Sequence, residues 1–380
     1  MMAFPLTMNP ATATGAQHPR HDRVRAQVLG DAAPGGHEWA TLQWVTAEVA
    51  RLLHLPVVTP GSEVGYLVPD RTLTLAEAAR LGIQDSDDLL GGVVPHAFVG
   101  TKIISHGLVN EGATAPAGWQ HALGHCMSPV TLPGYSAFSM DDALLAWELL
   151  AVDGPVRLKL PEGIGGHGQA SVRDAAHLRA LLAELAPASL HFAGVVLERE
   201  VQHPRTLSVG VVTCGRLEIA YCGIQHTVQD TQGNAVYGGS SLQVVRGGLE
   251  TLLDAPLTLE QRRAVEQARG YEEAVTLAYP TWFASRRNYD AIIGEDLHGR
   301  PCSGILEQSW RVGGATPAEL VALAAFAAEP ELRAVQAGSV ERRTLDPVPD
   351  DAQAYYAGVD PVQGPITKYR WLRPGWTDGH

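Results

Sequence analysis

Segments with the period of a strand alternate along this chain with segments that have the period of a helix. The clearest block has alternating apolar and charged side chains at 155–160, a glycine-rich turn at 161–168, a helix expected at 171–185 and an apolar strand at 193–200. Two hairpins, each turning at a glycine, are expected later in the chain. This alternation predicts an α/β or α+β fold with helices layered on sheets, and it argues against a helical bundle.

Helix signals also flank that block. Residues 36–53 repeat apolar side chains every three or four positions, and Ser139 offers a hydroxyl as the N-cap of another helix. Residues 317–336 are expected to be helical, with Pro330 as the point where that helix breaks. Residues 111–128 are rich in glycine, alanine and histidine, which predicts a loop.

These patterns divide the chain into four parts. Residues 1–25 are rich in alanine, threonine, proline and histidine, and we expect a disordered tail there. A small N-terminal domain with a linker is expected at 26–128, a larger domain at 129–338 and a C-terminal extension at 339–380. No internal repeat is visible in the sequence.

Composition excludes several classes of partner. The formal net charge is −13 and the basic residues form no patch, so we expect no nucleic-acid partner. No apolar stretch reaches the roughly 20 residues that cross a bilayer, and the first residues lack the pattern of a signal peptide. We therefore expect no membrane partner and a cytoplasmic location. The four cysteines are scattered along the chain, which predicts reduced thiols. A homodimer is one oligomeric state that the sequence leaves open.

Lysine is rare in this chain. Among its 28 lysines and arginines, only Lys102, Lys159 and Lys368 are lysines. Arginine serves wherever a generic positive charge is enough, so the positions that remain lysine are candidates for a compact charge that contacts phosphate. Chance retention of any one of them is an equal alternative.

Lys159 is followed by glycines at 163, 165, 166 and 168. Glycines allow backbone N–H groups to approach an anion closely and to adopt positive φ, and a lysine on the preceding strand can reach the same anion. The spacing is neither that of a P-loop nor that of a dinucleotide fingerprint. The glycine-rich turn therefore predicts either a phosphate-binding loop or a purely structural turn.

Two further stretches place acidic residues on apolar strands. Glu198, Arg199 and Glu200 end the strand at 193–200, where they could contact a nucleotide base and ribose or simply emerge into solvent. Asp290 and Glu307 lie on two strands joined by a turn, and pairing of those strands would bring two hard oxygen ligands for magnesium together. The alternative is two unrelated surface carboxylates.

Basic residues surround the second of these stretches. Arg311 follows Glu307 by four residues and offers a fork for phosphate or carboxylate. The pair at 286–287 could add such contacts, although a surface position is the simpler expectation. His121 and His125 are four apart, but Gly124 argues against a helix there, so we expect no metal site from the histidines.

The order of these features resembles the ATP-grasp superfamily, whose members include biotin carboxylase and D-alanine–D-alanine ligase. The resemblance covers roughly 98–323, and the preceding residues are similar to the small Rossmann-like domain that usually comes before an ATP-grasp. The segments YLVPDRTL, GGVVP, TKIISHGLV, SRRNYD and ILEQSWRVGGAT also resemble a bacterial family of uncharacterised proteins assigned to that fold. The implied fold class is therefore two α+β subdomains that clasp a nucleotide.

The resemblance implies a role for each residue of the set. Lys102 and Lys159 would contact ATP; Gly165, Gly166 and Gly168 would close over its phosphates; Glu198, Arg199 and Glu200 would read adenine and ribose; Asp290 and Glu307 would hold Mg²⁺; and Arg311, with Lys159, would stabilise the transferred phosphoryl group. Ser309 stands where the family has asparagine as a metal ligand, so its hydroxyl is the third candidate ligand, a weaker one through which a metal would be lost or bound by way of water. The spacing from Asp290 to Glu307 is longer than the family pattern.

The implied activity is that of a carboxylate–amine ligase that uses ATP and magnesium. A small-molecule acid would be activated as an acyl phosphate, and an amine or another nucleophile would displace the phosphate. Two alternatives stay open: a small-molecule kinase on the same scaffold, and a non-catalytic protein that binds ATP, which Ser309 would favour. A third alternative is a glycine-rich turn that is structural and binds no nucleotide.

Overall fold

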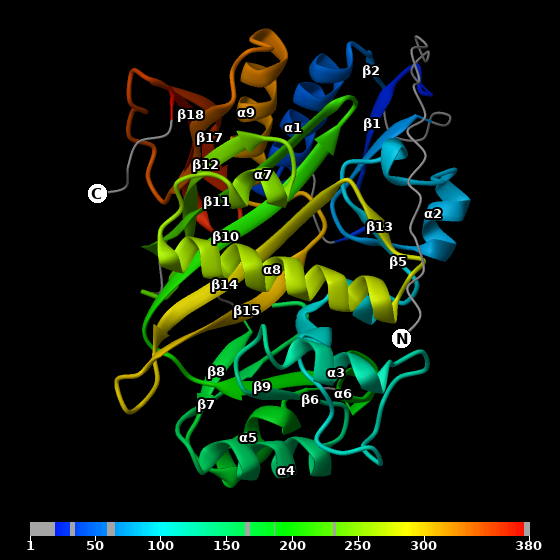
Figure 1. The fold of residues 1–380 in the computed structure, drawn as a ribbon, viewed down its shortest axis with the longest axis vertical. Coiled ribbons are helices and arrows are strands. Elements are labelled where there is room, and N and C mark those ends of the chain that lie inside the picture. Colours follow the sequence, from blue (N-terminus) through cyan, green and yellow to red (C-terminus); the bar gives the residue numbers. More distant parts are fainter. Residues whose placement is uncertain are drawn as a thin grey trace, which may run out of the picture.

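An eight-stranded antiparallel sheet runs through the upper part of the computed structural model, which describes residues 20–30, 35–58, 65–163, 168–185, 187–230 and 233–375 (Figure 1). Its strand order is β15-β14-β10-β11-β12-β16-β18-β17. The strands are β10 (Gln202–Cys214), β11 (Leu217–Gln229), β12 (Ala235–Arg246), β14 (Arg286–Glu295), β15 (Pro301–Ser309), β16 (Ala334–Arg342), β17 (Ala352–Asp360) and β18 (Gly364–Pro374). We call it the central sheet.

Helices cover both faces of the central sheet. Helices α7 (Leu249–Leu253) and α8 (Leu259–Ala278) pack on one face, and α1 (His37–Leu53) and α9 (Thr316–Ala328) pack on the other. Strand β11 illustrates the two-residue period that this requires. Its Ala220 and Cys222 are buried with α8, whereas Ile219 and Tyr221 are buried with α9.

A second antiparallel sheet lies at the lower end of the molecule in Figure 1 and has four strands in the order β6-β9-β7-β8. The strands are β6 (Gly134–Ala137), β7 (Val156–Lys159), β8 (Gln169–Val172) and β9 (Val195–Arg199), and the helices beside them are α4 (Met140–Ala151), α5 (Ala175–Ala183) and α6 (Pro187–Ala193). The hydroxyl of Ser139 accepts a hydrogen bond from the backbone N–H of Asp142 at 3.1 Å, which confirms the predicted N-cap of α4.

The N-terminal part is built around three parallel strands. Strand β1 (Val24–Gln27) pairs with β2 (Val57–Val58) and β3 (Tyr66–Pro69), and α1 connects β1 to β2. Further elements are β4 (Leu73–Thr74), α2 (Leu75–Leu81), β5 (Gly92–Val94), β13 (Phe283–Ala284), α3 (His121–Met127) and 3-10 turns at Ser86–Asp88, Ala97–Gly100 and Lys102–Ser105. Residues of β1 and α1 share a core cluster with α9, so this part packs onto the central sheet.

Several elements differ from the sequence expectations. Strand β1 begins at Val24, inside the expected tail, because Val24 is fully buried between β2 and β3; residues 1–19 lie outside the described residues. Helix α9 ends at Ala328, beside the break expected at Pro330, but the helix expected from there to residue 336 is absent, because β16 begins at Ala334. Pro330 has no N–H to continue the helix, and it forces Glu329 into an extended conformation with φ −125° and ψ 92°. Strand β16 then runs across residue 338, where a boundary was expected.

Helix α3 occupies part of the expected loop at 111–128. Its Gly124 packs against Gly107 so closely that a Cβ on residue 124 would lie 2.4 Å from the Cα of Gly107. This glycine therefore permits a close backbone contact and does not end the helix. Taken together, the mixed α+β fold expected from the sequence is confirmed, and none of the described helices combines the length and the apolar character needed to cross a membrane.

Candidate functional site

Asp290 on β14 and Glu307 on β15 lie directly opposite each other in the central sheet. The next pair is Ala291 with Ile305, so Leu306 is an extra residue, a β-bulge in β15. The bulge turns Glu307 toward the same face as Asp290, while Ile305 is buried on the α8 face. The bulge contributes one residue to the long spacing noted in the sequence, and the two carboxylates do come together.

The environment of Asp290 disfavours the negative charge of its carboxylate. Burial raises its pKa well above the ordinary value, and the negative charge of Glu307 raises it further. The amide of Gln225 donates to Asp290 Oδ1 at 2.6 Å, and this hydrogen bond and the charge of Lys102 act in the opposite direction. A cation between the two carboxylates would relieve this repulsion, so the donor set fits the preference of magnesium for hard oxygen ligands.

Lys102 connects the glycine-rich turn with this carboxylate pair. Its Nζ donates to the backbone carbonyl of Gly163 at 2.8 Å and lies 2.7 Å from Glu307 Oε2. Residue 102 comes from the 3-10 turn before α3, Gly163 follows β7 of the four-stranded sheet, and Glu307 belongs to the central sheet. One ammonium group thus joins three separate parts of the molecule.

Lys159 lies at the end of β7 and pairs with Glu198 on β9, and both side chains are buried. His106 approaches the same carboxylate, with its Nε2 3.3 Å from Glu198 Oε2. Burial alone would raise the pKa of Glu198, but the charge of Lys159 and the hydrogen bond from His106 outweigh it and lower that pKa to about 2. Glu198 therefore stays ionised and fixes the position of Lys159.

Arg311 follows β15 and is half-buried, and in the part of the chain that the structure describes it has no carboxylate partner. Its Nη1 donates to the carbonyl of Val312 at 3.0 Å. Burial lowers the pKa of Arg311, and the negative charge of Glu307 opposes that shift. Ser309, on the same strand, pairs in register with Asn288 and not with either carboxylate.

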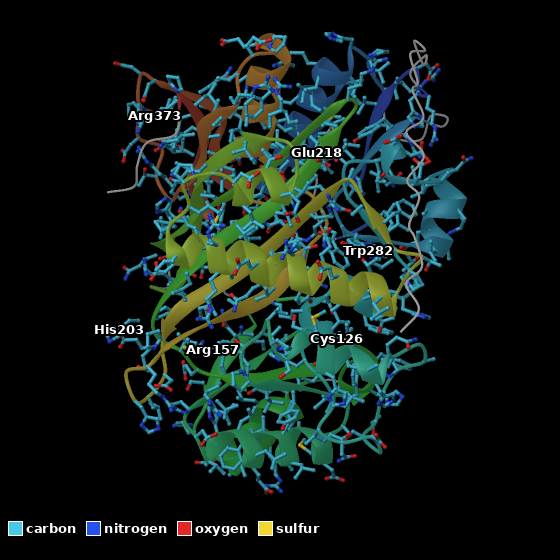
Figure 2. The ribbon with its side chains drawn as sticks, viewed as in Figure 1. Cys126, Arg157, His203, Glu218, Trp282 and Arg373 are labelled. Atoms are coloured by element: carbon cyan, nitrogen blue, oxygen red, sulfur yellow. The ribbon has the colours of Figure 1, made fainter. Side chains whose placement is uncertain are left out.

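The glycine-rich turn and the end of β9 contribute fewer described residues to the candidate site. Gly165 and Gly166 lie outside the described residues, and Gly168 has a φ of 71°, in the region that favours glycine. Arg199 pairs with Asp153 at 2.7 Å, and Glu200 pairs with Arg157, which projects from the four-stranded sheet (Figure 2). The structure therefore brings Glu198 to Lys159, whereas Arg199 and Glu200 have partners of their own.

Two arginines differ from the expected surface pair. Arg286 is fully buried and pairs with Glu319 on α9, and Arg287 is half-buried and pairs with Glu272 on α8 at 2.9 Å. The strand period sends these neighbours to opposite faces of the sheet, which sequence reasoning did not use. His106 and Gln225 were also missed as contacts of the acidic residues, because no local motif marks them.

The described residues contain no group of three or more histidine, cysteine, aspartate or glutamate side chains placed to hold a metal. Magnesium needs only one or two protein carboxylates when phosphate oxygens and water complete its shell. The pair Asp290 and Glu307 satisfies that smaller requirement.

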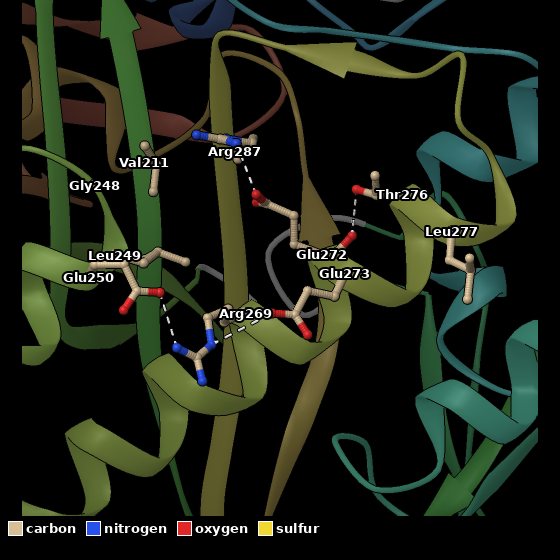
Figure 3. Close-up of a pocket in the computed structure, with 10 residues that line it drawn as sticks. All are labelled: Val211, Gly248, Leu249, Glu250, Arg269, Glu272, Glu273, Thr276, Leu277 and Arg287. Atoms are coloured by element: carbon tan, nitrogen blue, oxygen red, sulfur yellow. Dashed lines mark hydrogen bonds and ion pairs between the residues drawn. The ribbon is translucent and has the colours of Figure 1, made fainter. Parts of the chain in front are cut away.

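A groove of about 590 Å³ lies elsewhere, on the α8 face of the central sheet (Figure 3). Arg269 lies between Glu250 and Glu273 in it, and Glu272 pairs with Arg287. Its other lining residues are Val211, Gly248, Leu249, Thr276 and Leu277. The charged side chains there already pair with one another, so we assign the candidate site to the Asp290 face.

Comparisons with known proteins place the chain in a family but do not indicate which ligand it binds. A solved structure described as "Ca. Korarchaeum cryptofilum ACD1 in complex with coenzyme A" is 14% identical, covers 64% of this chain and 86% of that chain, and has a TM-score of 0.19. A likeness of that size supports no argument about fold or function. No curated protein matches the chain. The family model described as "Protein of unknown function (DUF3182)" matches residues 26–370, and the protein therefore belongs to that family.

Proposed function

We propose that this protein has an ATP-grasp fold, binds Mg-ATP between the four-stranded sheet and the central sheet, and is an ATP-dependent ligase that joins an acid to an amine or another nucleophile. Two separate antiparallel sheets, each packed against helices, support the fold assignment. The site residues come from the adjacent parts of both sheets and from the turn at 102–105.

The observation that carries the proposal is the position of Lys102. Its Nζ contacts both the glycine-rich turn, at the carbonyl of Gly163, and the carboxylate pair, at Glu307. In a Mg-ATP site the phosphate-binding turn and the metal-binding carboxylates must lie next to each other. A single ammonium group that contacts both supports such an arrangement.

The chain's own groups divide the work of binding. Asp290 and Glu307 would hold magnesium, Lys102 and Lys159 would neutralise phosphate oxygens, and Arg311 would contact the transferred phosphoryl group or the substrate acid. Bound Mg-ATP supplies an electrophilic γ-phosphoryl group with its charge partly neutralised. Catalysis would then rest on positioning and on electrostatic stabilisation of the developing charge.

The proposed reaction needs no nucleophilic side chain. An oxygen of the substrate carboxylate attacks the γ-phosphorus and ADP leaves; the amine then attacks the acyl carbon, phosphate leaves and the amine loses a proton. The buried thiols fit this view, because burial raises the pKa of Cys214 and of Cys222 to about 12 and leaves neither as a ready nucleophile.

Ser309 favours a second candidate, a protein that binds ATP without catalysis. A hydroxyl is a poorer oxygen ligand than the amide that the ATP-grasp pattern has at this place, so one metal position would be weak. A kinase that releases its phosphorylated product would use the same residues. The mass of the product separates a kinase from a ligase.

The test is nucleotide binding followed by turnover. We expect ATP with Mg²⁺ to raise the unfolding temperature of the full chain and to bind by calorimetry, because a ligand of the native state stabilises by mass action. ADP release would then be measured with a panel of small carboxylic acids, each with and without an amine. Lys159→Met should abolish ATP binding.

Lys368→Met is the matched control, because Lys368 is also a buried lysine but pairs with Glu341 at 3.0 Å on β16. It should bind ATP like the wild type at an equal folded fraction. If the wild type binds ATP but no acid gives ADP, the non-catalytic candidate replaces the ligase. If ATP does not bind at all, the glycine-rich turn is structural and the proposal fails.

A further inference from the structure

A chain of buried polar groups lies beneath the candidate site. Arg286 on β14 makes a two-point ion pair with Glu319 on α9, with Nε 2.7 Å from Oε2 and Nη2 2.8 Å from Oε1. The hydroxyl of Tyr221 donates to Glu319 Oε1 at 2.6 Å, and the amide of Asn288 donates to that hydroxyl at 3.1 Å and to Ser208 Oγ at 2.6 Å. All five residues are buried.

The remaining nitrogen of Arg286 points away from the ion pair. Its Nη1 donates to the backbone carbonyl of Ser309 at 3.1 Å and also to the carbonyl of Arg311. These two carbonyls belong to the end of β15 and to the residues that leave it toward α9. One rigid guanidinium therefore fixes two alternate residues of the segment that carries Arg311 and directly follows Glu307.

Two other contacts hold the rest of that segment but not its first residues. The hydroxyl of Ser339 donates to the carbonyl of Gly314 at 2.7 Å, and the hydroxyl of Thr316 accepts from the backbone N–H of Gly313 at 3.0 Å. Neither reaches residues 309–311. Trp310 has anchors of its own, because its buried ring stacks on Trp282 and its carbonyl accepts from the hydroxyl of Thr72 at 3.2 Å. Arg286 is the side chain that holds the carbonyls on either side of Trp310, those of Ser309 and Arg311.

We propose that Arg286 is a positioning residue for the candidate site, which places Ser309 and Arg311 in line with Glu307 through their backbone carbonyls. This inference rests on the proposed function for its catalytic consequence. Arg286 touches no substrate, because its side chain is enclosed by α9 and the sheet. Its loss should therefore displace Arg311 and impair phosphoryl transfer more than it impairs nucleotide binding.

Arg286→Lys is the informative variant. A lysine keeps a positive charge beside Glu319, but it lacks the fork that reaches the two carbonyls at the same time. Arg370→Lys is the matched control, because Arg370 is likewise buried and pairs with Glu48 at 3.0 Å, on β18 and away from residues 309–311. Both variants would be compared with the wild type at equal folded fraction.

Hydrogen exchange of the full chain tests the structural half of the proposal. We expect backbone amides at 310–313 to exchange at least about tenfold faster in Arg286→Lys, since local opening costs less when an anchor is lost. They should be unchanged in Arg370→Lys. Should Arg286→Lys fold poorly, the double variant Arg286→Met with Glu319→Leu removes both charges together, which is often tolerated in a buried pair. Unchanged exchange in the folded variant would overturn the proposal.

Kinetics test the catalytic half. We expect kcat for ADP formation to fall by about 10-fold to 100-fold in Arg286→Lys, the cost of a misplaced catalytic group, with the Kd for ATP within about threefold of the wild type. Equal loss in kcat and in ATP affinity would mean a general structural role and would contradict the proposal. If the wild type binds no ATP, the proposed function fails, while the exchange comparison still decides whether Arg286 positions this segment.

Discussion

Ile305 and Glu307 lie two residues apart on β15, yet their side chains point to opposite faces of the central sheet. In a regular strand such residues share a face. The extra residue Leu306 breaks that rule, because Ile305 pairs with Ala291 and Glu307 pairs with Asp290. The bulge thereby keeps Ile305 in the core while Glu307 joins Asp290.

Deletion of Leu306 is predicted to be tolerated. It would convert the bulge into a regular ladder in which Ile305 still faces Ala291 and Glu307 still faces Asp290. The variant should remain folded and keep stabilisation by Mg-ATP, measured by thermal unfolding with and without the nucleotide.

Deletion of Gln308, two residues further along β15, provides the contrast. The buried amide of Gln308 accepts from Tyr271 at 2.6 Å and donates to the carbonyls of Val99 and Thr101 at 2.9 and 2.8 Å. Its loss should lower the free energy of unfolding by about 3 kcal/mol or more, since several buried polar groups lose partners. Equal damage from both deletions would show that the ladder is not paired as described.

Glu307→Gln is predicted to lower the rate of ADP formation by about 100-fold or more, because it removes the charge that would bind magnesium. The dependence of the rate on Mg²⁺ concentration should shift to higher values. Glu295→Gln is the control, since Glu295 is an exposed carboxylate at the far end of β14. If the Glu307→Gln variant keeps the rate and the magnesium dependence of the wild type, Glu307 is not a metal ligand of the site.

The ion pair of Glu198 predicts a specific dependence of stability on pH. The pKa of Glu198 is about 2 in the folded protein, against an ordinary value of 4.5. A lowered pKa means that the carboxylate stabilises the folded state above pH 4.5 and that this contribution is lost as the pH falls from 4.5 toward 2. The loss approaches about 1.4 kcal/mol per pH unit for one proton.

Glu198→Gln should remove that dependence. Urea unfolding of the wild type and of the variant would be compared between pH 6 and the lowest pH at which both fold. We expect the wild type to be more stable at pH 6 by about 2 to 3 kcal/mol, and the difference to shrink on acidification. A difference that stays constant with pH would contradict the lowered pKa of Glu198.

Gly314→Ala is predicted to destabilise the protein by about 1 to 3 kcal/mol, because the new methyl group would overlap neighbouring atoms. A Cβ at residue 314 would lie 2.3 Å from the ring of Tyr237, which is itself held by a 2.7 Å hydrogen bond to Ser240. Gly313→Ala is the matched control, since the nearest atoms there are 3.8 Å away and neither glycine has a positive φ.

Thermal unfolding measures both variants. Gly313→Ala should stay within about 0.5 kcal/mol of the wild type, as substitutions without a clash usually do. A smaller effect at residue 314 than at residue 313 would mean that the segment between β15 and α9 does not lie against Tyr237.

Several local features of the fold could be predicted from the sequence because they depend on neighbours along the chain. The helical period at 36–53 became α1, the hydroxyl of Ser139 became the N-cap of α4, and the alternation at 155–160 became β7. The break expected at Pro330 is found, since α9 ends at Ala328, but the helix expected beyond it is replaced by the start of β16. Gly124 was taken as a helix breaker, although a close backbone contact explains it.

The sequence by itself determined which residue types were available for a phosphate and metal site: three lysines, a glycine-rich turn and carboxylates on apolar strands. Only the tertiary structure decided which of them meet. Strand pairing with a bulge joined Asp290 to Glu307, and the packing of the two sheets brought Lys102 to both Gly163 and Glu307. Arg286, which was expected at the surface, is buried in an ion pair with Glu319 on α9. Such contacts join residues up to about two hundred positions apart, where periodicity and capping carry no information.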